Sequence, residues 1–147
     1  EYQAKAPEYG FTIEAIGVMQ QSEVLQAADT MISKGVDCMT NLTDNNVVGV
    51  LPSILEKTND AGIPVYGSEI EQVKIGCIAS AGIEYVALGK RTGEMAAKIL
   101  KGEATAEEMP YETITDSEIY YNPDVLTAMG LTLPEDIAAE AIDVTAE

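Results

Sequence analysis

The sequence predicts an α/β fold: an open, mostly parallel sheet with helices on both faces. Segments with the period of strands alternate along the chain with segments whose apolar residues repeat at helical spacing. In the clearest unit, the apolar run 36–42 ends in the polar turn 43–46, and an apolar helical pattern then resumes through Glu56. A strand that feeds a helix through a short turn is the repeating unit of sheets whose parallel strands are joined by helices.

The first half of the chain is expected to alternate helix and strand. We expect a helix tail over 1–10 that Gly10 ends, a strand over 11–19, a helix over 23–34 with Ser22 as its N-cap, the strand 36–42, a helix over 46–61 that contains Pro52, and a strand over 63–68. Gly35 and Gly62 follow the last periodic residues of their helices, where glycine commonly ends a helix.

The second half continues in the same way. We expect an acidic turn at 68–71, a strand over 73–79, a helix over 85–100, an acidic connection at 104–110, a strand over 113–121 and a helix over 123–129. The helix 85–100 is the clearest, because Leu88, Met95 and Ile99 form an apolar stripe and Lys101-Gly102 is a strong end signal. The acidic tail from Pro134 is expected to be a short helix or disordered.

Composition and charge exclude several classes of protein. The 147 residues suit about one domain, and no run of 18 apolar residues predicts a membrane span. With 25 acidic and 8 basic residues the net charge is −17, so no basic surface is available to bind nucleic acid. The opening residues, Glu1-Tyr2-Gln3, lack the basic and apolar blocks of a signal peptide, which leads us to expect a mature or trimmed piece.

The residue types that commonly do chemistry are scarce. Histidine, the commonest metal ligand and general base, is absent from the sequence. Cys38 and Cys77 fall in different strand candidates and are expected to be buried free thiols, although spacing does not decide whether they pair. Gly89-Lys90-Arg91-Thr92 departs from the Walker pattern, and no GxGxxG, GxSxG, CxxC or HExxH occurs. We therefore expect no catalytic residue, metal or cofactor.

Polar residues follow the predicted strands, where ligands of open α/β sheets bind. Thr43, Asp44 and Asn45 offer a hydroxyl, a carboxylate and an amide after the strand 36–42. Asp44 or Asn45 is also suited to cap the next helix, and capping does not exclude contact with a ligand. Asp44, Glu69 and Glu84 all fall near strand ends, but chance placement among so many acidic residues explains this better than an acid–base pair.

The segment 78–102, IASAGIEYVALGKRTGEMAAKILKG, identifies a family resemblance. It resembles the substrate-binding proteins of ABC importers of the tryptophan/tyrosine type, which have the periplasmic-binding-protein fold I. The matched motifs, in order, are Thr43-Asp44-Asn45, Ile63-Pro64-Val65, Gly82-Ile83-Glu84-Tyr85, Leu88-Gly89, Thr92-Gly93, the run 95–102 and the run 128–134. The resemblance spans residues 11–137.

The resemblance implies two lobes that close on a small ligand, of which this chain would form the C-terminal part. Residues 1–83 would be the α/β core of the second lobe without its first strand, which normally lies between 11–18 and 36–42. Residues 84–111 would be a crossover helix that packs on an absent first lobe, 112–133 a returning strand and helix, and 134–147 an acidic tail.

By family position, the ligand contacts would be Thr43, Asp44, Asn45, Ser68, Glu69 and Glu84. Asp44 or Glu84 would pair with a ligand ammonium, and Glu84 stands where family members often carry aspartate. The resemblance implies an amino-acid-like ligand such as an aromatic one, an ABC importer permease as the partner of the full-length protein, and an extracytoplasmic location as a cell-surface lipoprotein or in a periplasm.

Two other functions fit the same fold class. One is a flavodoxin-like enzyme domain that uses Asp44 and Glu69, and the other is the effector-binding domain of a transcription regulator. The missing catalytic motifs disfavour the enzyme, and the acidic charge disfavours a DNA-binding protein.

We further expect this chain to form a homo-oligomer, because the apolar stripe of Leu88, Met95 and Ile99 and two strand edges would lack partners.

Overall fold

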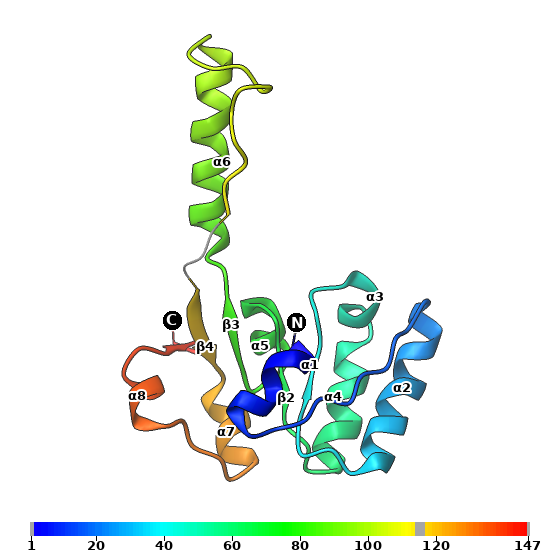
Figure 1. Cartoon of the computed structure of the whole chain (residues 1–147). Helices are drawn as coiled ribbons and strands as arrows, with labels where there is room; N and C mark the ends of the chain where they lie inside the picture. The colour runs from blue at the N-terminus through cyan, green and yellow to red at the C-terminus, as the bar shows by residue number, and fades with distance from the viewer. Residues whose placement is uncertain (1, 114–116, 147) are drawn as a thin grey trace.

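The computed structural model describes residues 2–113 and 117–146, whose strands form two small adjoining sheets (Figure 1). In one sheet, β1 (Met39–Thr40) and β2 (Val65–Tyr66) are parallel. In the other, β3 (Ala79–Gly82) is antiparallel to β4 (Glu118–Tyr121), which is parallel to β5 (Ile142–Asp143).

Two backbone hydrogen bonds join the sheets. Ile78 N donates to Val65 O at 2.8 Å, and Gly67 N donates to Ala79 O at 2.9 Å. Because residue numbers rise together along both segments, β2 and β3 run in the same direction. The carboxyl ends of β1, β2 and β3 therefore meet at one edge, at the base of the long helix α6 (Figure 1).

Helices cover both faces of this strand layer. The larger core is formed with α2 (Gln21–Lys34), α4 (Leu51–Asp60) and α5 (Ile70–Ile75), and its buried residues are Val24, Ala28, Leu51, Ile54, Leu55, Val65, Val73, Cys77 and Tyr120. A smaller core joins Ile78, Ala79 and Tyr121 to Leu126 of α7 (Pro123–Ala128). Consecutive strand residues point to opposite faces, so Tyr120 and Tyr121 place the two cores on opposite sides.

Several predicted helices are confirmed. At the N-terminus, α1 (Tyr2–Lys5) and η1 (Ala6–Tyr9) end at Gly10 with φ +79°. The predicted helix 23–34 begins earlier, and its N-cap is Gln20 rather than Ser22, because the Glu23 carboxylate accepts from Met19 N and Gln20 N. The predicted helix 46–61 is divided at Gly49 into α3 (Asn45–Val48) and α4, with Pro52 in the first turn of α4, where its missing N–H costs nothing.

Two predicted strands are wrong. Residues 11–18 are neither helix nor strand, and they are mostly exposed. An apolar, extended segment becomes a strand only when a neighbouring strand pairs with it, and none does so within the described residues. The predicted turn and strand over 68–79 are replaced by α5, which Glu69 caps and Gly76 (φ +137°) ends; only Ala79 belongs to a strand.

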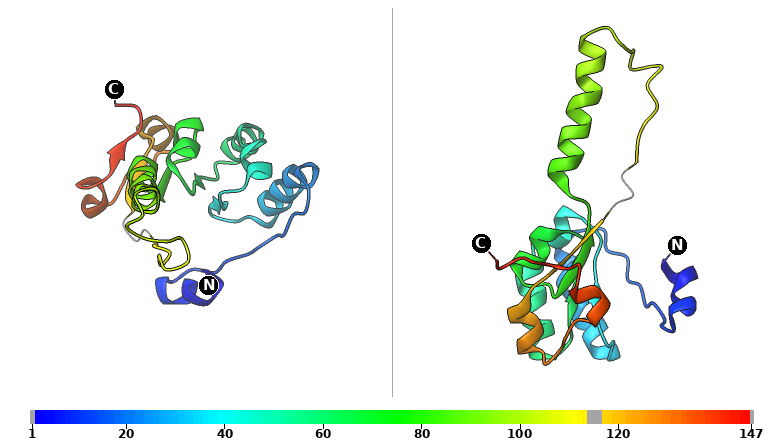
Figure 2. Two further views of the ribbon diagram at one scale, coloured as in Figure 1. Left: turned by 90° about the horizontal axis from the view of Figure 1, so that it is seen from above. Right: turned by 90° about the vertical axis from the view of Figure 1, so that its left-hand side faces the viewer.

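Helix α6 (Tyr85–Leu100) has the predicted bounds and extends away from the sheets, with the chain returning beside it (Figures 1 and 2). Arg91 Nε donates to Glu112 Oε2 on the returning segment at 2.6 Å. No residue of α6 is buried; Leu88 and Ile99 of the stripe are each 37% exposed, and Met95 is partly covered. None of the helices in the described ranges is long and apolar enough to cross a bilayer.

The C-terminal elements agree in part with prediction. Of the predicted strand 113–121, β4 forms the end, and residues 114–116 lie outside the described residues. The predicted helix 123–129 is confirmed as α7. The tail forms the short helix α8 (Glu135–Ala138) and also β5, a strand that its acidic sequence does not indicate.

The two cysteines differ more than their sequence positions suggest. Cys77 is buried, whereas Cys38 is exposed, so the predicted burial of Cys38 is wrong; both are free. Burial, with a smaller contribution from the Glu69 charge, raises the pKa of the Cys77 thiol to about 12.

We expect a maleimide reagent at pH 7 to label one thiol of the folded chain, Cys38, and two thiols after denaturation. Mass spectrometry measures the number of labels. Rapid double labelling of the folded chain would contradict the buried position of Cys77.

Candidate ligand-binding edge

The six predicted site residues lie along the edge where β1, β2 and β3 end, here called the carboxyl edge. Thr43, Asp44 and Asn45 follow β1, Ser68 and Glu69 follow β2, and Glu84 follows β3. Thr43 Oγ1 lies 2.9 Å from Ser68 Oγ, so the turns after β1 and β2 are in direct contact. The fold thus brings together the residues that the sequence analysis proposed for one site.

All three carboxylates of this edge cap a helix. Asp44 accepts from Asn46 N (2.8 Å) and Val47 N (3.4 Å) at the start of α3. Glu69 accepts from Glu71 N (2.8 Å) and Gln72 N (3.0 Å), and Glu84 accepts from Val86 N (2.7 Å) and Ala87 N (2.6 Å). The capping interpretation of Asp44 is confirmed, while Asn45 is the first residue of α3 rather than its cap.

The three caps leave different groups available to a ligand. Glu69 is buried and uses both carboxylate oxygens, and Glu84 also uses both. Asp44 is exposed and uses only Oδ1; its Oδ2 accepts no hydrogen bond from the described residues. Asp44 is therefore the carboxylate of this edge with an uncommitted oxygen, which is what a ligand ammonium requires.

Two residues of this edge were missed by the sequence analysis. Asn41 and the fully buried Gln72 connect the turns after β1 and β2 through side-chain hydrogen bonds. A glutamine three residues after a capping residue is a recognisable signal, because it resembles the capping box. Its contact with Asn41, 31 residues away, has no local signal.

Tyr120 lies beneath the edge, opposite Ser80 on β3. Its hydroxyl donates to Glu118 Oε2 at 2.5 Å. This hydrogen bond, followed by burial and by the charges of Glu118 and Glu84, raises the pKa of Tyr120 to about 12. Tyr120 is therefore neutral at physiological pH, and its buried ring belongs to the larger core.

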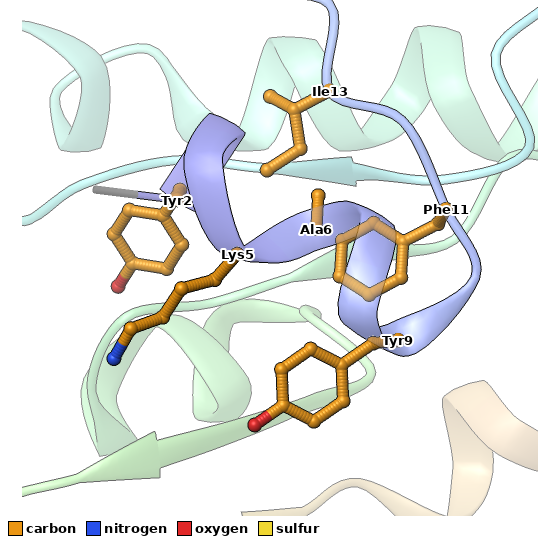
Figure 3. A pocket seen from close by; sticks show the side chains of 6 residues that line it. All are labelled: Tyr2, Lys5, Ala6, Tyr9, Phe11 and Ile13. Carbon is orange, nitrogen blue, oxygen red and sulfur yellow. The ribbon is translucent and has the colours of Figure 1, made fainter.

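Two hollows occur elsewhere in the described part of the chain. One of about 490 Å³ is lined by Tyr2, Lys5, Ala6, Tyr9, Phe11 and Ile13, and Figure 3 shows these side chains around the N-terminal helices and the extended segment that follows them. The other, of about 350 Å³, lies between β3 and the residues around α7 and α8. None of the six predicted site residues lines either hollow, although the second hollow reaches Tyr66 and Gly67 at the end of β2.

The described residues contain no cluster of side chains that suits a metal ion. No cluster of three or more His, Cys, Asp or Glu side chains in the described ranges is placed to hold a metal ion. The hydroxyls of Thr43 and Ser68 and the second carboxylate oxygen of Asp44 are groups that suit reversible binding of a small polar or zwitterionic molecule.

Sequence comparison matches the chain to a family model and to a similar protein. The family model described as ABC transporter substrate binding protein matches residues 1–145. A tyrosine-binding protein of Clostridioides difficile strain R20291 is 34% identical over 115 residues, which make up 78% of this chain and 33% of that protein.

Solved structures resemble the whole chain. The ABC domain of Streptococcus pneumoniae in complex with L-Trp superposes with a TM-score of 0.87 at 27% identity, over 97% of this chain and 48% of that one. A conserved domain protein of Vibrio cholerae gives 0.83 at 26% identity, over 95% and 47%. A ligand-free, open substrate-binding protein with adhesive properties from Clostridium difficile gives 0.68 at 33% identity, also over 95% and 47%. The chain thus spans a third to a half of the length of these relatives.

Proposed function

The chain belongs to the ABC transporter substrate-binding protein family, and on this premise we propose that it is the second lobe of an importer's solute-binding protein, with an aromatic amino acid as ligand. Two similar proteins support the ligand class: one is described as tyrosine-binding and one was solved with L-Trp. The fold and the open carboxyl edge support the role of one wall of a binding cleft.

The observation that carries this proposal is the contact between the hydroxyls of Ser68 and Thr43, next in sequence to Asp44, whose Oδ2 accepts no hydrogen bond from the described residues. In our proposal, Asp44 Oδ2 accepts from the ligand ammonium, and the pair Thr43 and Ser68 donates to the ligand carboxylate. Asn45, at the first position of α3, adds a polar group next to this pair. Glu69 and Glu84 act by capping α5 and α6, which holds the turns in place.

The remaining contacts would come from a first lobe. Solved relatives contain about twice the length of this chain, and none of the six proposed contact residues lines either of the two hollows described above. We propose that the aromatic ring of the ligand is covered between two lobes. We further propose that the two-lobe protein is extracytoplasmic, either anchored as a lipoprotein or free in a periplasm, and that it delivers its ligand to an ABC permease. Alone, this chain is proposed to self-associate through α6.

Calorimetry with L-tryptophan and L-tyrosine tests the proposal. We expect the two-lobe protein to bind at least one of them and the 147-residue chain alone to bind neither measurably. Half of a cleft buries too little of a small ligand to offset the translational freedom lost on binding. Binding of neither amino acid by the two-lobe protein would refute the ligand class, and tight one-to-one binding by the chain alone would refute the need for a first lobe.

A further inference from the structure

A single amide side chain, that of Gln72, connects the two turns of the carboxyl edge. Gln72 is in the first turn of α5 and is 0% exposed. Its Oε1 accepts from Asn41 Nδ2, after β1, and from Ser68 N, after β2, with both distances 3.1 Å. Its Nε2 donates to Ser68 Oγ at 3.0 Å. A buried amide is unfavourable unless it is hydrogen-bonded, and these contacts satisfy it.

These contacts continue where the backbone ladder stops. The pairing between β1 and β2 ends at Thr40 and Tyr66. Beyond it, side chains complete a closed ring that runs through Asn41, Gln72, Ser68 and Thr43, and Thr43 returns to Asn41 through the backbone of the same turn. The ring fixes the turn after β1 against the turn after β2.

Gly67 leaves the space that the amide of Gln72 occupies. A Cβ at position 67 would lie 3.0 Å from Gln72 Cβ and 3.3 Å from Gln72 Oε1. Both distances are tighter than ordinary contacts, so a side chain at this position would displace the amide. Gly67 thus gives a second way to disturb the ring, one that changes no polar group.

We propose that Gln72 is a positioning residue. It makes the hydroxyl pair of Thr43 and Ser68 a hydrogen-bond donor to a ligand carboxylate, and this inference rests on the proposed function. The two hydroxyls carry two hydrogens, and one of them lies between Thr43 and Ser68. Because the contact between Gln72 and Ser68 Oγ uses an amide hydrogen, only one hydroxyl hydrogen is used inside the ring, and the second is left for a group outside it. An α-amino acid bound with its ammonium at Asp44 presents its carboxylate to that hydrogen.

The variant Gln72→Glu keeps the shape of the side chain but changes the group that faces Ser68 Oγ from a hydrogen-bond donor to an acceptor. A carboxylate accepts from Asn41 Nδ2 and Ser68 N as the amide does, and these donors favour its ionised form. It also accepts the Ser68 hydroxyl hydrogen, so Thr43 must donate to Ser68 and no hydrogen is left for the ligand. We expect the affinity of the two-lobe protein for L-tryptophan to fall about tenfold or more, with the affinity for tryptamine, which lacks the carboxylate, changing less than about twofold.

Two further variants separate this role from general damage to the fold. Gly67→Ala displaces the amide without adding charge, and we expect it to reduce affinity for tryptophan more than affinity for tryptamine. Glu71→Gln changes an exposed carboxylate on the same helix, which pairs with Lys74 outside the ring, and we expect both affinities to be unchanged. Equal losses for both ligands in Gln72→Glu and Gly67→Ala would overturn the inference.

A readout without ligand keeps the inference separate from the proposed function. In the 147-residue chain, Gln72→Met removes the acceptor of Ser68 N, so hydrogen exchange of that amide, followed by NMR, should accelerate about tenfold or more while α2 amides stay protected. Unchanged exchange at Ser68 would overturn the positioning role whether or not tryptophan binds. If the wild-type two-lobe protein binds neither aromatic amino acid, the proposed function fails, and the donor role of the hydroxyl pair fails with it.

Discussion

Replacing Asp44 by asparagine should lower the affinity of the two-lobe protein for L-tryptophan or L-tyrosine by about 10- to 100-fold. The substitution removes the charge that pairs with the ligand ammonium, and a hydrogen bond to a charged group contributes about 1.5–3 kcal/mol. It leaves the start of α3 intact, because asparagine is as good an N-cap as aspartate and its oxygen can accept from Asn46 N. Isothermal calorimetry of both proteins measures the change.

Two comparisons make this result specific. A ligand without the ammonium, indole-3-propionate, should bind the Asp44→Asn protein as well as the wild type, since it makes no contact with the lost charge. Glu84→Gln is the matched control at the neighbouring cap, where both oxygens already accept from Val86 N and Ala87 N, and we expect it to change tryptophan affinity less than Asp44→Asn. A large loss in Glu84→Gln with none in Asp44→Asn would assign the ammonium to Glu84 instead.

The parts of the structure that depend on local signals were predictable. Helix α6 has the expected bounds because its apolar period, the acidic residue Glu84 before it and Gly102 after it all agree. Asp44 was identified both as a cap and as a residue near a strand end, and both hold because a turn after a parallel strand starts the next helix. From α2 to β2, the order of helices and strands follows from the same alternation.

Most of what was missed depends on distant residues, while α5 was missed because its local cap was not recognised. The segment 11–18 has the pattern of a strand, yet pairing requires a neighbour that no described residue provides. Residues 68–79 contain enough apolar residues for a strand, but the carboxylate of Glu69 starts a helix at Ile70. The importance of Gln72 depends on its contact with Asn41, which becomes visible only once β1 and β2 are placed side by side.

The second large effect concerns the exposed arm. Helix α6 extends from the body without a buried residue, and Val86 and Leu100 on it are 77% and 87% exposed (Figure 2). Burying such side chains is worth about 1.5–3 kcal/mol each, so two chains gain by covering each other's arms. The net charge of −17 on each chain opposes this, and salt screens that repulsion, with a Debye length of about 10 Å at 0.1 M. We therefore expect a dimer whose population increases with salt.

Sedimentation velocity at micromolar concentration, from 0.02 to 0.5 M NaCl, tests this expectation. Val86→Lys should raise the dissociation constant of the dimer tenfold or more, because the loss of one buried valine costs about 1.5 kcal/mol or more. The added lysine lowers the net negative charge, so a weaker dimer cannot be attributed to added repulsion. Gln26→Lys, an exposed position on α2, adds the same charge away from α6 and should leave the dimer as strong or stronger. A wild-type chain that remains monomeric at every salt concentration would show that the return segment beside α6 covers enough of its apolar surface.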